Sequence, residues 1–177
     1  HNSEKYYNLK LSLSKIDKHK IILHNYFNHN SYLLLEKINS ELIEKIHILK
    51  IFNDDILDIV ILFKQFGKEL GLKQKYIMIR IEKTIDCENN KIIFTNNDII
   101  LIDKDLYENY LLSINLNKSK YEHILYKFGK INITFKNYNV QKLIHPHINT
   151  DNTDNTDTVD IDFCMDFQMT LKDIVPI

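Results

Sequence analysis

The chain has 177 residues with 44% hydrophobic content and a formal net charge of −1 at pH 7, which suits one domain with a substantial core. Two cysteines are too few for a disulfide framework, and three glycines are too few for a dinucleotide fingerprint or a P-loop. No apolar run approaches the ~20 residues that span a bilayer. With no signal peptide visible, we expect an intracellular protein, cytoplasmic or virus-associated, unless an upstream signal has been removed.

The predicted elements begin with a β-hairpin and a loop in residues 1–30. Leu9, Leu11 and Leu13 alternate with polar residues, which indicates a first strand. The apolar run 21–23 then indicates a second strand that pairs with the first, and residues 25–30 form a polar loop.

Residues 31–71 are predicted to form a pair of antiparallel helices. Apolar side chains recur at helical spacing from Tyr32 to Phe52, and again from Ile56 to the region of Gly67 and Gly71. The polar residues 53–55 between the two patterns break the chain and begin the second helix.

Residues 72–148 are predicted as sheet with short helices. Alternation over 76–82 indicates a strand, residues 86–90 a turn, and residues 91–95 a returning strand that 99–102 continue. Asp103 or Asp105 is predicted to cap a helix that reaches Ile114, and residues 119–128 are predicted as a weaker helix. Alternation over 131–135 indicates a further strand.

The C-terminal part combines a low-complexity loop, residues 149–158, with a strand over residues 159–172. Seven apolar residues from Val159 to Leu171 alternate with polar ones without a break, and this exceeds the usual strand of about five or six residues. The predicted fold is therefore one α+β domain over residues 1–177, with a mostly antiparallel sheet that the C-terminal strand completes.

The residue usage indicates a source more than a function. The sequence contains no alanine, although alanine is the best helix former, and Arg80 is its single arginine. An AT-rich genome accounts for this skew together with the abundant isoleucine and asparagine, so we expect a virus or a protozoan.

The leading functional hypothesis is a non-enzymatic protein-interaction or assembly module that forms homo-oligomers. A long, complete strand behind a flexible acidic loop can add to a sheet edge in another chain. The basic region 118–142 is a candidate electrostatic partner for the acidic C-terminal part. We expect a protein partner or self-association, no membrane, no cofactor and no catalytic residue, and we leave enzymatic activity open.

The first alternative is nucleic-acid binding by lysines and aromatic residues in the region 118–142. Aromatic rings can stack on bases while lysines neutralise phosphates. The candidate binding residues are Lys118, Lys120, Tyr121, Tyr126, Lys127, Lys130, Phe135, Lys136 and Tyr138.

The second alternative is a metal-dependent enzyme. Asp160 and Asp162 lie about 7 Å apart on the same face of the predicted C-terminal strand, so their carboxylates can share a hard cation such as Mg²⁺. The string Asp-Ile-Asp-Phe at 160–163 resembles the metal-binding part of nucleotidyltransferases, which implies a nucleotidyl-type activity. The Gly-Ser pair that holds phosphates in that family is absent upstream of this string.

Overall fold

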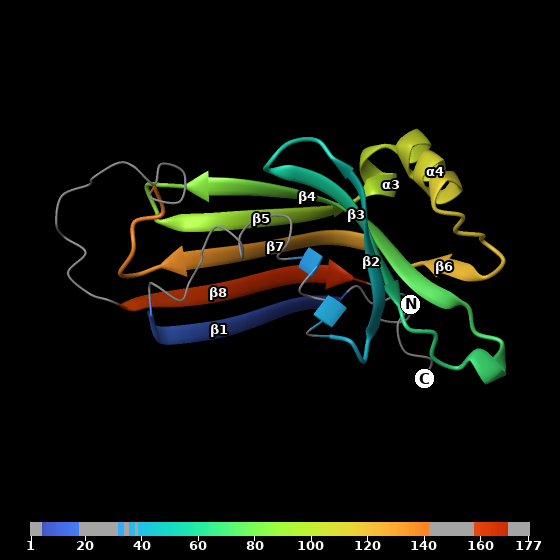
Figure 1. Cartoon of the computed structure of the whole chain (residues 1–177), viewed down its shortest axis with the longest axis horizontal. Coiled ribbons are helices and arrows are strands. Elements are labelled where there is room, and N and C mark those ends of the chain that lie inside the picture. The colour runs from blue at the N-terminus through green and yellow to red at the C-terminus, as the bar shows by residue number, and fades with distance from the viewer. Residues whose placement is uncertain (1–4, 18–31, 34–35, 38, 142–157, 170–177) are drawn as a thin grey trace.

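The structure, a computed structural model, describes residues 5–17, 32–33, 36–37, 39–141 and 158–169. It contains one mostly antiparallel sheet in the strand order β1-β8-β7-β5-β4-β3-β2, and a short β6 that pairs with β4 in parallel (Figure 1). The strands are β1 (Lys5–Asp17), β2 (Ile43–Ile51), β3 (Ile56–Phe63), β4 (Gln74–Asp86), β5 (Lys91–Asp98), β6 (Tyr121–His123), β7 (Tyr126–Phe135) and β8 (Thr158–Met169). The helices are η1 (Lys68–Leu70), α3 (Ile99–Ile102) and α4 (Lys104–Ser113).

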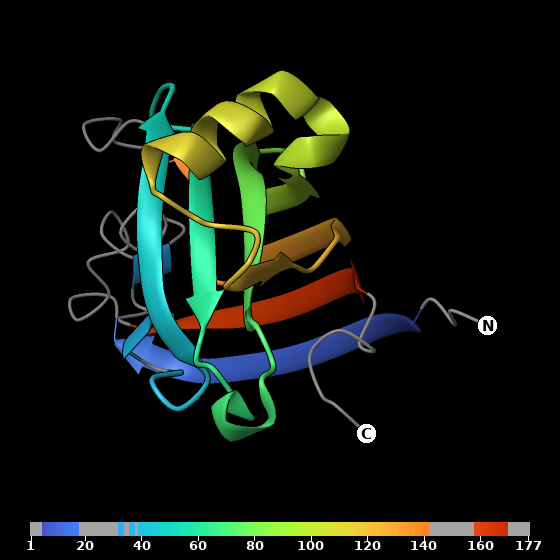
Figure 2. The same cartoon turned by 90° about the vertical axis from the view of Figure 1, so that its right-hand side faces the viewer.

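The sheet is strongly bent, so that β2 and β3 run across the direction of β8 and β1 (Figure 2). Apolar side chains from β2 to β8 meet in one cluster on one side of the sheet, which we call the inner face. On the opposite side, the outer face, α3 and α4 pack on β3 and β4 in a second cluster. The predicted α+β class with a mostly antiparallel sheet is therefore confirmed. No helix among the described residues is long and apolar enough to cross a bilayer.

The predicted long C-terminal strand is confirmed as β8. Val159 and Ile161 point to the inner face and are almost fully buried, at 0% and 3% exposure. However, β8 is hydrogen-bonded on both sides, to β1 and to β7. Its edges are filled by its own chain, so it is not available to add to a sheet in another chain.

The predicted helix pair is wrong, because β2 and β3 form a β-hairpin there instead. Among the described residues of this region, helical turns are present only at residues 32–33 and 36–37 and in the short η1. Strand β3 is buried on both faces, since Leu57 and Ile59 pack in the inner cluster while Val60 packs under α4. A strand that is apolar on both faces also satisfies helical spacing, so the pattern could not separate the two. The side chain of Asn53 accepts hydrogen bonds from the backbone N–H groups of residues 55 and 56 in the tight turn between the strands.

Two smaller predictions also differ from the structure. Residues 99–102 are the helix α3 instead of a strand, because the Asp98 carboxylate accepts a hydrogen bond from the Ile100 N–H and begins a helix there. Residues 119–128 contain β6 and the start of β7 instead of a helix. The helix through residue 113 is confirmed, with Asp103 as its cap. The predicted strand 21–23 and loop 149–158 lie outside the described residues.

Candidate functional site

Cross-strand pairs align the apolar side chains of the inner face in continuous rows. Leu11 of β1 lies opposite Phe163 of β8, and Phe163 lies opposite Ile133 of β7. Ile133 in turn lies opposite Ile92 of β5. Because paired residues of antiparallel strands point to the same face, the row from β1 to β5 is entirely apolar.

The exposure of this face rises steeply toward β1. Ile59 and Ile81, in the bent part of the sheet, are 0% exposed, whereas Leu11 is 54% exposed and Leu9 60%. The bend closes the inner face over β3 and β4 and leaves it open at β1, which is an edge strand among the described strands. We call this open part the β1–β8 strip, and it consists of Leu9, Leu11, Leu13, Ile131, Phe163 and Met165.

Covering the apolar β1–β8 strip would contribute favourable free energy. Fully burying one leucine side chain is worth about 1.5–3 kcal/mol. Three leucines of β1 point to the same side, because they alternate along one strand and lie opposite Met165, Phe163 and Ile161. The arrangement therefore suits an extended apolar molecule that lies along the strand.

A polar group lies deeper in the inner face. The Tyr32 hydroxyl donates to the Asn96 side chain at 3.3 Å, and Tyr126 also hydrogen-bonds to Asn96. Burial raises the pKa of the Tyr32 and Tyr126 hydroxyls above the ordinary value for tyrosine. Both hydroxyls therefore keep their protons at neutral pH, and Asn96 is satisfied within the core.

Gly129 lets the ring of Tyr126 lie against the β7 backbone. A Cβ atom at position 129 would overlap the Tyr126 hydroxyl and lie 2.8 Å from the ring carbon that carries it. We expect Gly129→Ala to lower the free energy of unfolding by about 1–3 kcal/mol, because the buried ring has to move. Urea denaturation measures the effect, with Lys130→Ala as the control at the neighbouring position. Equal stabilities of the two variants would contradict the close packing.

A small hollow lies beside Tyr32, and it is too small to hold a drug-sized ligand. It has no enclosed space for even a water molecule, whereas pockets for drug-sized ligands usually contain about 300–1,000 Å³. Lys83 reaches its rim and forms an ion pair with Asp55 at 2.8 Å. The lining residues are Tyr32, Asp54, Asp55, Leu57, Ile81, Lys83 and Phe94. The β1–β8 strip is therefore the larger candidate surface.

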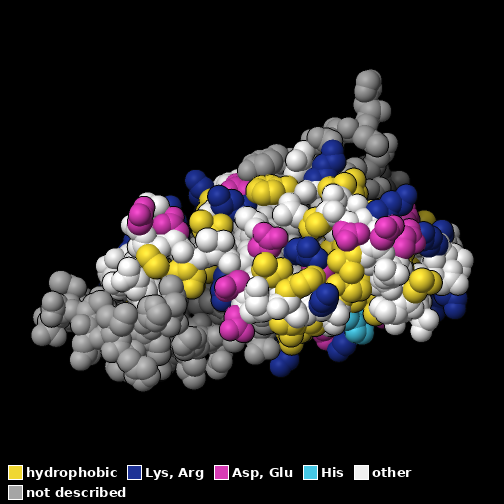
Figure 3. All heavy atoms as spheres, turned by 90° about the horizontal axis from the view of Figure 1, so that it is seen from above, with side chains coloured by type: hydrophobic (Ala, Val, Ile, Leu, Met, Phe, Trp, Pro, Cys, Tyr) yellow, Lys and Arg dark blue, Asp and Glu magenta, His cyan; other side chains and the backbone are white. Residues whose placement is uncertain are grey.

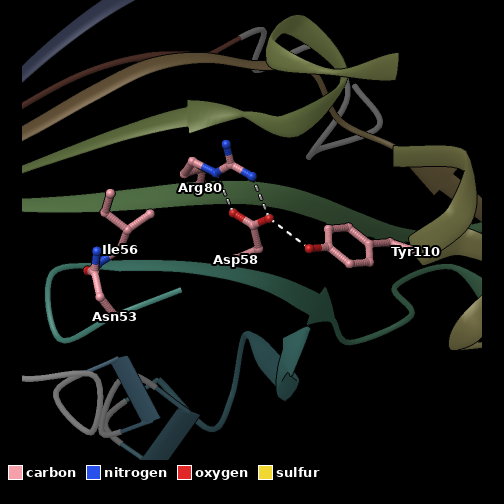
Figure 4. Close-up of polar contacts among 5 residues, drawn as sticks. All are labelled: Asn53, Ile56, Asp58, Arg80 and Tyr110. Carbon is pink, nitrogen blue, oxygen red and sulfur yellow. Dashed lines mark hydrogen bonds and ion pairs between the residues drawn. The ribbon is translucent and has the colours of Figure 1, made fainter. Parts of the chain in front are cut away.

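On the outer face, a buried ion pair joins the sheet to α4 (Figure 4). The Asp58 carboxylate is 0% exposed and accepts two hydrogen bonds from the Arg80 guanidinium, at 2.8 and 2.9 Å. The Tyr110 hydroxyl of α4 donates to the same carboxylate at 2.9 Å. Arg80 also lies 4.5 Å from the centre of the Phe52 ring. Hydrogen bonding to Asp58 raises the pKa of Arg80, and the network connects β3, β4 and α4.

A second polar cluster connects β6 to the sheet through side-chain contacts. The Nε2 atom of His123 lies 2.9 Å from the Asp98 carboxylate, although the ring is not aligned for a hydrogen bond. The His123 ring packs against the rings of Tyr76 and Tyr107, whose hydroxyls are 2.8 Å apart. Burial, followed by the hydrogen bond to Tyr107, raises the pKa of Tyr76. The cluster joins β4, β6 and α4, and it lies apart from the β1–β8 strip.

The structure does not gather the lysines and aromatic residues of region 118–142 into one surface. Tyr126 and Phe135 belong to the core, at 8% and 2% exposure, so their rings are not presented to a ligand in solution. Lys118 precedes β6, whereas Lys136 follows β7, and the ten residues of β7 alone extend over roughly 33 Å. On the side of the molecule that Figure 3 shows, basic and acidic side chains are interspersed.

The remaining candidates of that region are spread over three segments. Lys120 and Tyr121 lie at the start of β6, Lys127 and Lys130 lie in β7, and Tyr138 follows β7 and packs against Phe135. Lys118 pairs with Glu108 at 3.0 Å. The role of these residues in ligand binding stays a prediction.

Asp160 and Asp162 lie on the outer face of β8, and both contact groups of their own chain. Asp162 forms an ion pair with Lys136 at 2.8 Å, and this contact holds the pKa of Asp162 below its ordinary value. The Asp160 carboxylate accepts a hydrogen bond from the Lys15 N–H at 2.7 Å. Within the described ranges, no three His, Cys, Asp or Glu side chains are grouped to hold a metal. Metal binding by the two aspartates stays a prediction.

The sequence signals for the observed sites were present but incomplete. The alternation of Leu9, Leu11 and Leu13 identified their strand, yet only the position of β1 at the sheet edge leaves them exposed. Arg80 interrupts an apolar strand, and a buried arginine requires a carboxylate partner. That signal could have indicated an acid nearby in space, but it could not have identified Asp58.

Comparison with known proteins finds similarity in structure only. No family model and no curated protein sequence matches the chain. The human StarD13 (DLC2) lipid transfer and protein localization domain matches with a TM-score of 0.51 and 4% identity, over 94% of this chain and 63% of that chain. Human STARD10 matches with a TM-score of 0.50 and 7% identity, over 96% of this chain and 53% of that chain. The chain therefore spans less than two thirds of the length of either structure.

These similarities overturn the functional hypotheses based on the sequence. The prediction of a viral assembly or interaction module, with a protein partner or self-association, is wrong. The nucleic-acid-binding and nucleotidyl-type alternatives are wrong as well. The reason is that the matched fold includes a lipid transfer domain. The fold also uses β8 inside its own sheet and places Tyr126 and Phe135 in the core. The chain shares its α+β fold with the human StarD13 domain and with human STARD10.

Proposed function

We propose that this protein binds a lipid and holds its apolar chain on the inner face, along the β1–β8 strip. The observation that carries the proposal is the apolar row on the inner face, which runs from Ile92 in the core through Ile133 and Phe163 to Leu11, 54% exposed at the sheet edge. The fold shared with a human lipid transfer domain supports the same ligand class.

The dimensions of the strip favour an extended ligand. Leu9 and Leu13 are four residues apart on one strand, which is roughly 14 Å at ~3.4 Å per residue. The strip extends across β1, β8 and β7, and neighbouring strands lie about 4.8 Å apart. A surface of this shape covers one side of an acyl chain along its length. The proposal therefore concerns the apolar part of the ligand, and the headgroup stays open.

The experiment compares the same new side chain on the two faces of β1. Leu11→Gln places an amide on the strip, whereas Lys10→Gln places it one residue away on the exposed outer face. Losing about 1.4 kcal/mol of apolar contact weakens binding tenfold. We expect Leu11→Gln to bind a fluorescent phosphatidylcholine about tenfold or more weakly than the unmodified protein, and Lys10→Gln to bind it equally well.

Stability measurements separate a binding defect from misfolding. Because Leu11 is more than half exposed, we expect Leu11→Gln to change the urea midpoint little. Unmodified protein that binds no fluorescent lipid, or equal affinities for the Leu11 and Lys10 variants, would count against the proposed function.

A further inference from the structure

The turn between β3 and β4, residues 64–73, presents two large apolar side chains to solvent. Phe66 is 51% exposed and Leu70 is 76% exposed. The turn contains η1 and projects from the sheet at the lower right of Figure 1 and at the bottom of Figure 2. Neither residue belongs to the clusters of the inner or the outer face.

The backbone of this turn is held in a defined shape. Gly67 and Gly71, two of the three glycines of the chain, adopt left-handed conformations with φ of 70° and 73°. The Leu70 N–H donates to the Gly67 carbonyl at 2.9 Å, and the Gln65 side chain donates to the Leu72 carbonyl at 2.7 Å. Phe66 and Leu70 are therefore exposed by a closed, hydrogen-bonded turn.

Exposed lysines lie in the same turn as the two apolar side chains. Lys64, Lys68 and Lys73 are exposed in the turn, with Glu69 as its single acid. The loop between α4 and β6 lies directly beside it, because the Lys73 ammonium donates to the Lys118 carbonyl at 2.8 Å. That loop adds the exposed lysines at 118 and 120, and the first of these also pairs with Glu108.

The combination of projecting apolar side chains and neighbouring ammonium groups matches the chemistry of an anionic bilayer surface. Apolar side chains enter the acyl boundary while lysines contact phosphate and carboxylate headgroups. A protein partner usually needs a broad complementary surface, whereas a bilayer accepts two side chains on a narrow turn. We propose that the β3–β4 turn docks this protein on membranes that contain anionic lipids, with Phe66 and Leu70 inserted.

This docking does not require the proposed lipid site, since the turn contributes no residue to the β1–β8 strip. It goes beyond ligand binding, because it specifies where the protein meets the bilayer. The two proposals are tested by different variants, Leu11→Gln for the strip and the turn variants for docking. Failure of one therefore leaves the other intact.

The test is co-sedimentation with vesicles of phosphatidylcholine, with or without phosphatidylserine. We expect the double variant Phe66→Ser and Leu70→Ser to bind anionic vesicles at least tenfold more weakly than the unmodified protein. The matched control is Ile51→Ser with Leu112→Ser, because those side chains are 54% and 76% exposed on β2 and α4. The control should bind within about twofold of the unmodified protein.

A second pair of variants tests the charge requirement. Lys64→Gln with Lys68→Gln should weaken binding to anionic vesicles at least tenfold, and Lys10→Gln with Lys104→Gln should change it little. All these positions are exposed, so thermal melting should confirm that every variant folds. Equal binding to neutral and anionic vesicles, equal losses in the control variants, or no binding to either vesicle would overturn the proposal. Capture of an acidic protein without vesicle binding would also overturn it and assign the turn to a protein partner.

Discussion

Raising the pH above about 10 is expected to unfold this protein within one or two pH units. Five tyrosines are buried, with exposures of 8% or less, and each has a raised pKa in the folded state. Burial is the largest cause at every one of them, because the phenolate form is poorly solvated in the core. The five residues are Tyr32, Tyr76, Tyr107, Tyr110 and Tyr126.

The sign of the effect follows from proton binding in the two states. Below pH 10 tyrosine is neutral in both states, so the stabilisation is fully present. Above pH 10 the unfolded chain releases protons that the folded chain keeps, and the free energy of unfolding falls. Each tyrosine contributes up to about 1.4 kcal/mol per pH unit as long as its folded-state pKa stays above the pH, so five contribute at most about 7 kcal/mol per unit. The free energy of unfolding of a domain is about 5–15 kcal/mol, so a rise of one or two pH units is enough to bring it to zero.

Circular dichroism and tyrosinate absorbance, followed together against pH, check this prediction. About half of the tyrosinate absorbance should appear in the same cooperative transition as the loss of circular dichroism, because five of the ten tyrosines are buried and lose their protons only on unfolding. Tyr126→Phe should reduce the dependence of stability on pH by about 1.4 kcal/mol per unit. A rise of tyrosinate absorbance to the full value for all ten tyrosines at constant circular dichroism would contradict the raised pKa values.

Replacing the buried carboxylate of Asp58 is expected to have the second large effect. Asp58→Ala leaves the Arg80 guanidinium, whose side chain is only 17% exposed, without its carboxylate partner. The Tyr110 hydroxyl loses its acceptor at the same time. Breaking a buried ion pair in this way typically costs about 3–5 kcal/mol, so we expect urea denaturation to show a loss of this size.

A double variant distinguishes the loss of a partner from the loss of the whole network. Asp58→Leu combined with Arg80→Met removes both charges and keeps apolar volume between the sheet and α4. Buried pairs replaced by apolar residues are often neutral in stability, so the double variant should be much more stable than Asp58→Ala. Equal losses in the two variants would show that the ion pair does not act as a unit.

The sequence predicted elements correctly where one face of a strand or helix is buried and the other is exposed to solvent. In β8, Val159 and Ile161 alternate with aspartates, and the structure places them in the core. The helix after residue 103 was predicted from its cap, and the Asp103 side chain accepts the expected hydrogen bond. Such signals are local, because a period or a cap depends only on nearby residues.

The sequence failed where both faces of an element are buried by distant segments. Strand β3 packs its inner side chains in the core and its outer ones under α4, so its sequence shows no polar face. The carboxylate partner of Arg80 could not be predicted either, because Asp58 is 22 residues away along the chain. Contacts of this kind depend on which strands become neighbours.

By itself, the sequence determined the mixed α+β class, the long C-terminal strand and the apolar side of the first strand. Only the tertiary structure decided that residues 43–63 form strands, that β8 is paired on both sides, and that Leu9, Leu11 and Leu13 remain open. The physical reason is the bend of the sheet. It brings the inner side chains of β3 and β4 together and leaves the edge strand β1 outside the closed core, and no local pattern encodes that bend.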